Sequence, residues 1–136
     1  MNFNSPAVVA SATGCPIVPS GFAESYGDGD PQRALRRLRD RFGGRPVVTT
    51  GRTGGLYFRG ARIRRYPARR VRVRDTTGAG DAFHGAFAAG IAHGLEFEAA
   101  IGLAARAASV CCTALGATTA LMSGPIPRSR ARAAAP

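Results

Sequence analysis

The fold is decided by the stretch Asp75-Thr76-Thr77-Gly78-Ala79-Gly80-Asp81-Ala82-Phe83-His84-Gly85-Ala86-Phe87-Ala88. A carboxylate opens it, a small Gly-Ala-Gly turn follows, and a second carboxylate, Asp81, stands where an apolar helix begins. Small residues let the backbone approach a ligand closely. The first turn of a helix presents unbonded N–H groups and the positive end of the dipole. The pattern therefore predicts an anion held beside a proton acceptor, which is what phosphoryl transfer to a hydroxyl requires.

The same stretch resembles the C-terminal signature of the ribokinase/PfkB carbohydrate kinases. The resemblance implies that Asp81 is the catalytic base and that Gly78, Ala79 and Gly80 form the anion hole for the transferred phosphate. It also implies an α/β fold, the C-terminal portion of a ribokinase-like three-layer α/β/α architecture. ATP with Mg²⁺ would then be the phosphoryl donor.

A second motif, Thr49-Thr50-Gly51-Arg52-Thr53-Gly54, follows the strand pattern of residues 46–50. It resembles the Thr-x-Gly-x-x-Gly nucleotide loop of the same family, and on that resemblance Thr49, Gly51 and Gly54 contact nucleotide, together with Gly116 further along. Glycines and a threonine hydroxyl allow close approach to phosphates. By itself this signal is weak, because many hairpins contain glycines.

Metal binding is predicted at Asp75 and Thr77, where the resemblance implies a loop that holds a monovalent cation such as K⁺. Asp75 could equally cap the turn by accepting backbone N–H groups, and the sequence leaves both roles open. The family usually carries an Asn-x-x-Glu-type motif that organises magnesium. Here Ser20 and Ala23 take the Asn and acid positions and Glu24 stands one residue later, which weakens any metal site in that segment.

Periodicity and turn residues predict the elements around these motifs. Expected helices span residues 31–41, 78–93 and 96–113; expected strands span 7–10, 17–18, 46–50, 56–58, 61–66 and 71–74. Asp30 should cap the first helix, with Pro31 at its first position. The residues expected to face the core are Ala34, Leu35, Leu38, Phe83, Phe87 and Ile91. In the last helix Ala99, Ala100, Leu103 and Ala107 are expected to be available for packing.

The chain of 136 residues suits one domain, residues 1–124, followed by an Arg/Ala/Pro-rich tail, residues 125–136, that we expect to be disordered. The resemblance covers residues 7–124 but only the C-terminal half of such a kinase. We therefore expect a truncated chain whose sugar-binding half is missing. Without a membrane-length apolar run or a signal peptide, the expected location is the cytoplasm. Cys15, Cys111 and Cys112 have no metal-site spacing and are interpreted as small buried thiols.

The basic residues number 19, all of them Arg, and the formal net charge is +11. Such a charge suggests nucleic acid at first sight. The arginines spread over many segments with few aromatic residues between them, and a GC-rich genome explains the absence of Lys. We interpret them as solvated side chains rather than as a nucleic-acid groove.

The sequence as a whole predicts an ATP-dependent sugar kinase whose partners are ATP and a sugar or sugar phosphate, with a homo-oligomer left open. The first alternative is an inactive remnant that still binds nucleotide. The second is an Arg-rich nucleic-acid-binding module. A dinucleotide-binding enzyme is disfavoured because no GxGxxG follows a strand.

Overall fold

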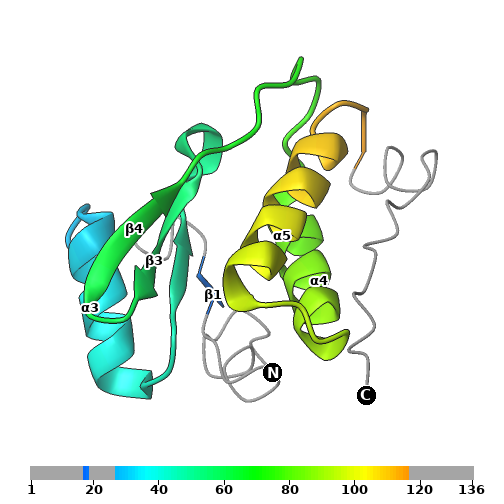
Figure 1. Cartoon of the computed structure of the whole chain (residues 1–136). Coiled ribbons are helices and arrows are strands. Elements are labelled where there is room, and N and C mark those ends of the chain that lie inside the picture. The colour runs from blue at the N-terminus through cyan, green and yellow to red at the C-terminus, as the bar shows by residue number, and fades with distance from the viewer. Residues whose placement is uncertain (1–16, 19–26, 117–136) are drawn as a thin grey trace, which may run out of the picture. The chain divides into compact units, whose positions relative to one another are not determined.

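The structure, a computed structural model, describes residues 17–18 and 27–116. The chain divides into two compact units, one ending at Arg70 and one beginning at Val71, and each is described by itself. The first unit holds β1 (Ile17–Val18), α3 (Pro31–Phe42), β2 (Val47–Thr49), the short 3₁₀ helix η1 (Gly51–Thr53), β3 (Gly55–Arg59) and β4 (Arg62–Tyr66) (Figure 1). The second unit holds α4 (Ala79–Ala92) and α5 (Phe97–Cys111).

The sheet of the first unit has the strand order β1-β2-β3-β4. β1 pairs with β2 in parallel, whereas the pairs β2–β3 and β3–β4 are antiparallel. The β3–β4 hairpin turns at Gly60, whose φ of 61° lies in the left-handed region that glycine adopts without strain. The hairpin expected around Gly60 is therefore confirmed.

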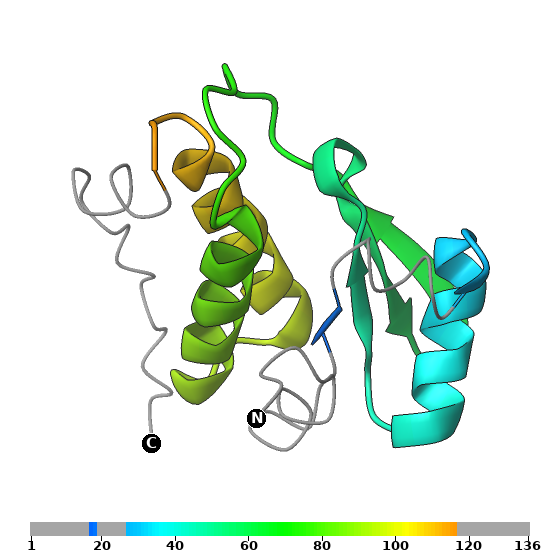
Figure 2. The same cartoon turned by 180° about the vertical axis from the view of Figure 1, so that it is seen from behind.

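α3 begins and ends where the sequence predicts. The carboxylate of Asp30 accepts the N–H of Gln32 at 2.9 Å, Pro31 occupies the first turn, and Gly43 ends the helix with a φ of 69°. The helix packs on one face of the sheet (Figure 2). Its buried residues, with those they contact in the sheet, are Ala34, Leu35, Leu38, Val48, Leu56 and Phe58. The three predicted core residues of α3 are confirmed.

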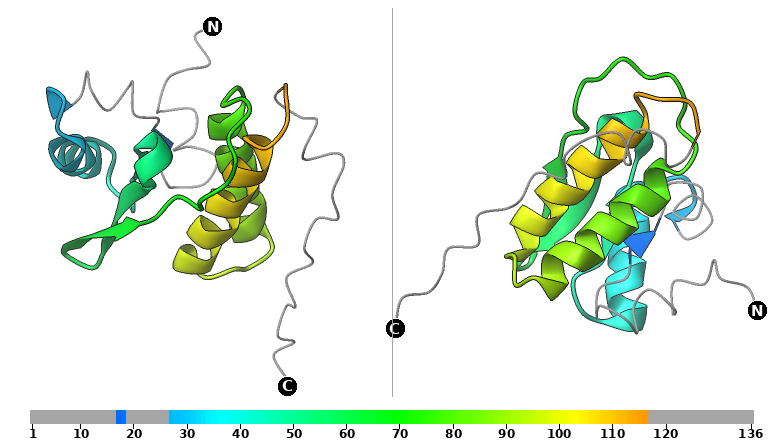
Figure 3. Two further views of the ribbon diagram at one scale, coloured as in Figure 1. Left: turned by 90° about the horizontal axis from the view of Figure 1, so that it is seen from above. Right: turned by 90° about the vertical axis from the view of Figure 1, so that its right-hand side faces the viewer.

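In the second unit α4 and α5 lie side by side (Figure 3). The rings of Phe87 and Phe97 meet edge to face with centroids 5.4 Å apart. Gly90 permits close approach, because a Cβ there would lie 3.2 Å from the Cβ of Ala100. Phe83 and Phe87 are buried as predicted, and Ile91 is half-buried.

Two expectations about residues 71–113 are wrong. No strand forms at residues 71–74: Val71 and Val73 are 37% and 57% exposed, and the Arg74 N–H donates to the Cys112 carbonyl at 2.8 Å. The alternating pattern finds no neighbouring strand among the described residues, so it cannot form a ladder. In α5, Ala99 is exposed, whereas Ala100 is buried and Leu103 and Ala107 are half-buried, so the packed face of the helix leaves Ala99 outside.

Several predictions lie outside the described residues: the strand at residues 7–10, the Ser20–Glu24 segment, Cys15 and the tail. Cys111 is buried and Cys112 is half-buried, and neither forms a disulfide with a described residue. Burial raises the pKa of both. Within the described part of the chain, none of the helices combines the length and apolarity needed to span a membrane.

Candidate functional site

The start of α4 is built around Gly78. Gly78 caps the helix with φ 78° and ψ 0°, a left-handed conformation that side chains disfavour. Its carbonyl accepts the first helical bond, from the N–H of Ala82 at 2.9 Å. One turn earlier, the N–H of Ala79 donates to the carbonyl of Thr76 at 3.2 Å. The local chain therefore forces a tight turn directly into a helix.

This turn leaves backbone donors exposed at the positive end of α4. Among the described residues, the N–H groups of Gly78, Gly80 and Asp81 have no acceptor. Such donors form an anion site at a helix N-terminus. The predicted anion hole names Gly78, Ala79 and Gly80; in the structure the Ala79 donor is already used by Thr76. The N–H of Asp81, at the third position of the helix, is a further unbonded donor among the described residues, and sequence reasoning missed it although its position could have suggested it.

Asp81 lies in the first turn of α4 and its side chain is exposed. The side chain therefore lies at the positive end of the helix dipole. One turn later the Nδ1 of His84 lies 2.6 Å from the carbonyl oxygen of Gly80, so the imidazole ring is held against the same turn. The carboxylate of Asp81 and the unbonded N–H groups of Gly78, Gly80 and Asp81 thus come from one four-residue segment, residues 78–81.

Asp75 holds this turn to a segment far along the chain. Its Oδ1 accepts the N–H of Thr77 at 2.9 Å and the hydroxyl of Thr77 at 2.7 Å, and its Oδ2 accepts the N–H of Gly116 at 3.0 Å. These bonds lower the pKa of Asp75 to about 2, with the backbone N–H of Thr77 as the largest cause, followed by the Thr77 hydroxyl and the Gly116 N–H. Of the two roles that the sequence leaves open, the described contacts are those of a turn cap.

Asp75 should make stability depend on pH in acid. A carboxyl whose pKa is lower in the folded state stabilises the fold fully above its unfolded pKa of about 3.9, and loses that effect as pH falls towards 2. Asp75→Asn cannot accept at both oxygens and should lower the thermal midpoint at pH 6. Because Asn does not titrate, the gap to the unsubstituted chain should narrow between pH 5 and pH 2. A gap that stays constant over this range, in calorimetry or circular dichroism, would contradict the assignment.

The predicted nucleotide loop lies in the first unit and is closed by its own backbone. The N–H of Thr50 donates to the carbonyl of Gly54 at 2.8 Å, and the N–H of Gly54 donates to the carbonyl of Gly51 at 3.1 Å. Gly51 and Gly54 have φ values of 63° and 98°. The hydroxyl of Thr53 lies 2.8 Å from the hydroxyl of Thr50, a contact that sequence reasoning missed although the two threonines stand three residues apart in the motif. Thr49 is the last residue of β2.

The predicted site residues therefore form two groups, each within its own unit. The second unit brings together Asp75, Thr77, Gly116 and the Gly78–Asp81 turn, although Gly116 is 41 residues from Asp75. The first unit brings together Thr49, Gly51 and Gly54. Gly116 uses its N–H on Asp75, so its backbone donor is not available to a ligand. Across residues 17–18 and 27–116, no three His, Cys, Asp or Glu side chains gather as a metal site would need.

Comparison with known proteins shows which family the chain resembles. A sequence model of the pfkB family carbohydrate kinases matches residues 22–123. A ribokinase of Lactococcus lactis subsp. lactis (strain IL1403) is 37% identical over 87 residues, which cover 64% of this chain and 29% of that protein. A fructokinase of Klebsiella pneumoniae is 38% identical over 104 residues, covering 70% of this chain and 33% of that protein. The chain thus spans about a third or less of these relatives.

The fold agrees with this assignment. The crystal structure of aminoimidazole riboside kinase from Salmonella enterica, in complex with aminoimidazole riboside and an ATP analogue, matches with a TM-score of 0.73 and 32% identity. The match covers 85% of this chain and 42% of that one. The partial ribokinase-like α/β fold expected from the signature stretch is confirmed. With the family model matching most of the sequence, this chain belongs to the pfkB family of carbohydrate kinases.

Proposed function

We propose that this chain supplies the phosphoryl-transfer part of an ATP-dependent sugar kinase. The observation that carries the proposal is the start of α4. There Gly78 in the left-handed conformation, the unbonded N–H groups of Gly80 and Asp81, and the exposed Asp81 carboxylate come from one turn. A helix N-terminus attracts the negative charge of a phosphoryl group, and the carboxylate beside it can accept a proton.

In the proposed reaction a sugar hydroxyl oxygen bonds to the γ-phosphorus of ATP. The bond from that phosphorus to the β,γ-bridging oxygen breaks, and its electron pair leaves with ADP. Asp81 accepts the hydroxyl proton, and the N–H groups of Gly78, Gly80 and Asp81 stabilise the charge on the phosphoryl oxygens. We assign Thr49, Gly51 and Gly54 to the nucleotide. The space beside the positive-φ Gly51 is open to a phosphate, and Gly54 lets the loop close against residues 66–68.

Metal ions have less support from this chain's own residues. Mg²⁺ typically binds through substrate phosphates, water and only one or two carboxylates. When bound it would neutralise the charge of the phosphates. Asp75 already accepts three hydrogen bonds. These bonds favour a role in stabilising the turn over a role as a metal ligand. The K⁺ loop predicted at Asp75 and Thr77 stays a prediction that potassium dependence of activity would test.

The alternative function is nucleotide binding without turnover. It is favoured by the coverage, since this chain spans 29% of the Lactococcus ribokinase. The acceptor sugar must be positioned in line with the γ-phosphate, and such positioning supplies about 7–11 kcal/mol of the barrier lowering in well-oriented reactions. We assign no residue of this chain to that task.

Two measurements separate the functions. Calorimetric titration of MgATP into this chain tests nucleotide binding. Fusion of residues 22–123 behind the preceding part of the Lactococcus ribokinase then tests phosphorylation of ribose, followed as ADP release. Binding together with turnover in the fusion supports the kinase. Binding without turnover in a folded fusion supports the nucleotide-binding alternative, and no ATP binding in either protein contradicts both.

A further inference from the structure

The arginines of this chain are distributed unevenly. Residues 41–74 contain eleven arginines and no Asp or Glu, whereas residues 75–116 contain one arginine, Arg106, and four carboxylates. A composition bias of the whole gene raises Arg in every segment, so it does not explain this contrast. The acid-free segment includes the complete β3–β4 hairpin of the first unit.

The register of the hairpin gathers the arginines on one face. Arg59 stands directly opposite Arg62, and Tyr57 stands directly opposite Arg64. Residues two apart on a strand share a face, so Arg59, Arg62, Arg64 and Tyr57 lie together; we call this set the Arg–Tyr face. The three arginines are exposed and Tyr57 is half-buried. The other face of the hairpin packs Phe58 against α3.

This arrangement carries an electrostatic cost. Like charges directly opposite each other in a sheet are destabilising. Arg33 and Arg37 form ion pairs with Asp28, near the start of α3, whereas the three arginines of the Arg–Tyr face form none with a described residue. An anion bound between Arg59 and Arg62 would relieve their repulsion, and each guanidinium can hold two phosphate oxygens at once.

We propose that the Arg–Tyr face binds single-stranded nucleic acid. Arg62 and Arg64 are about 6.8 Å apart along an extended strand, so they form a row of cations suited to a repeating phosphate backbone. The Tyr57 ring, 6.5 Å from the Tyr66 ring, lies beside this row as a surface on which a base can stack. Two other anionic ligands fit this face less well. An acidic protein surface has no bases to stack on the Tyr57 ring, and the bases of a duplex are already stacked on one another.

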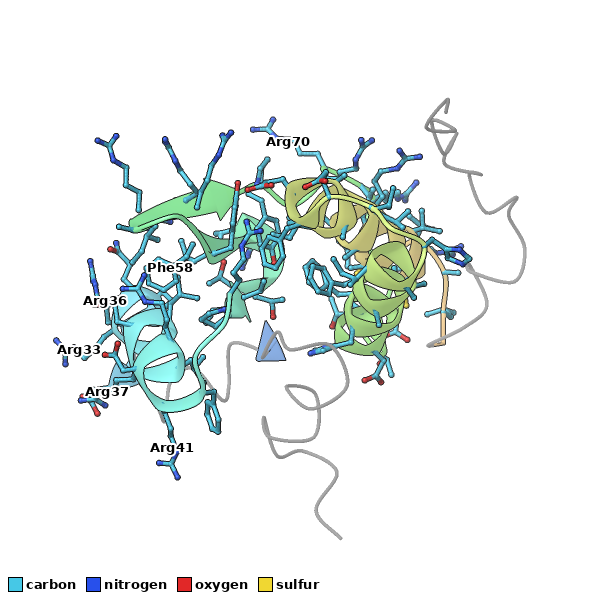
Figure 4. All side chains as sticks on the ribbon, turned by 60° about the horizontal axis from the view of Figure 1, so that its bottom comes forward. Arg33, Arg36, Arg37, Arg41, Phe58 and Arg70 are labelled. Atoms are coloured by element: carbon cyan, nitrogen blue, oxygen red, sulfur yellow. The ribbon has the colours of Figure 1, made fainter. Side chains whose placement is uncertain are left out.

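The α3 arginines play a different part. Arg33, Arg36, Arg37 and Arg41 point outward from α3 (Figure 4), which packs on the other face of the sheet. Two of them pair with Asp28. The α3 arginines therefore agree with the interpretation of solvated side chains. Their positive field would attract a polyanion only from a distance. The hairpin has no such acidic partner in residues 41–74.

The test is fluorescence anisotropy with the full chain and a labelled oligothymidylate of about 20 nucleotides, longer than the ~4–16 nucleotides of one binding site. We expect binding at about 50 mM salt that weakens steeply by about 200 mM. Arg59→Gln/Arg62→Gln/Arg64→Gln should weaken binding at least about tenfold and reduce the salt slope by about 2, the contribution of three phosphate contacts to a single strand. Tyr57→Leu should weaken binding about tenfold with the salt slope unchanged, because it removes only stacking.

The matched control is Arg72→Gln/Arg74→Gln/Arg106→Gln, which removes the same charge from the second unit. It should leave affinity within about twofold and the slope nearly unchanged. Equal weakening by both triple variants would overturn the proposal, since it would show attraction by net charge alone. So would absence of binding at low salt, equal affinity for a duplex of the same length, or equal competition by polyglutamate, which would indicate an acidic protein partner. Circular dichroism of each variant ensures that a loss of binding is not a loss of fold.

Discussion

Asp81→Asn should lower kcat by about 10²- to 10⁴-fold in the fusion with the Lactococcus segment, the usual contribution of a general base. The side chain keeps its size and its place in the first turn of α4, but the amide cannot take the proton of the attacking hydroxyl. KM for ATP should change little, because the backbone donors of Gly78 and Gly80 remain. The measurement is the initial rate of ADP release with ribose.

The matched control for this substitution is Glu96→Gln. Glu96 precedes α5, makes no side-chain cap bond and is exposed, so the variant removes one carboxylate charge at another helix start. Its kcat should stay close to that of the unsubstituted fusion. If Asp81→Asn likewise keeps kcat within about threefold, a change of less than 1 kcal/mol in the barrier, Asp81 is not the base and the assignment fails.

The second large effect is expected at Gly54 in the proposed nucleotide loop. Gly54→Ala should lower the free energy of unfolding of the first unit by about 3 kcal/mol, the upper end for a strained backbone position. Gly54 has a φ of 98°, and a Cβ there would lie 2.7 Å from the backbone nitrogen of Ala68 and closer still to the carbonyl oxygen of Tyr66. Those atoms are backbone, so they cannot move aside as a flexible side chain would.

Urea unfolding followed by tyrosine fluorescence measures this effect. The chain has no Trp, and its three tyrosines, Tyr26, Tyr57 and Tyr66, all belong to the first unit. Gly51→Ala serves as the control, because Gly51 has a φ of 63° but open space around its Cβ position. We expect a loss of only about 1 kcal/mol there, from the left-handed backbone alone. Similar losses at Gly51 and Gly54 would show that crowding against residues 66–68 is unimportant.

Local sequence rules succeeded where neighbours in the chain decide the structure. The cap of Asp30 and the stop at Gly43 bound α3 because the groups involved lie within one turn of the helix end. The hairpin around Gly60 likewise follows from a residue that accepts positive φ between two extended segments. The buried face of α3 follows from helical periodicity.

The same rules failed where a distant partner was needed. The alternation of Val71 and Val73 with arginines reads as a strand, but a strand requires a neighbour to accept its hydrogen bonds. In the structure the Arg74 N–H bonds to the end of α5 instead. The assignment of Ala79 to the anion hole stays a prediction, although its N–H donates to the carbonyl of Thr76. Periodicity and motif position do not record which backbone group is already bonded.

The sequence by itself determined the family and the position of Asp81 at a helix start. Both properties depend on spacing within a few residues, and the signature from Asp75 to Ala88 contains them. The tertiary structure decided that Asp75 joins Thr77 to Gly116, and that Arg59 faces Arg62 across the hairpin. Both are pairings between separate segments. A hydrogen bond or a charge repulsion depends on distance in space and not on separation along the chain. Only the folded chain and the strand register bring these residues within that distance.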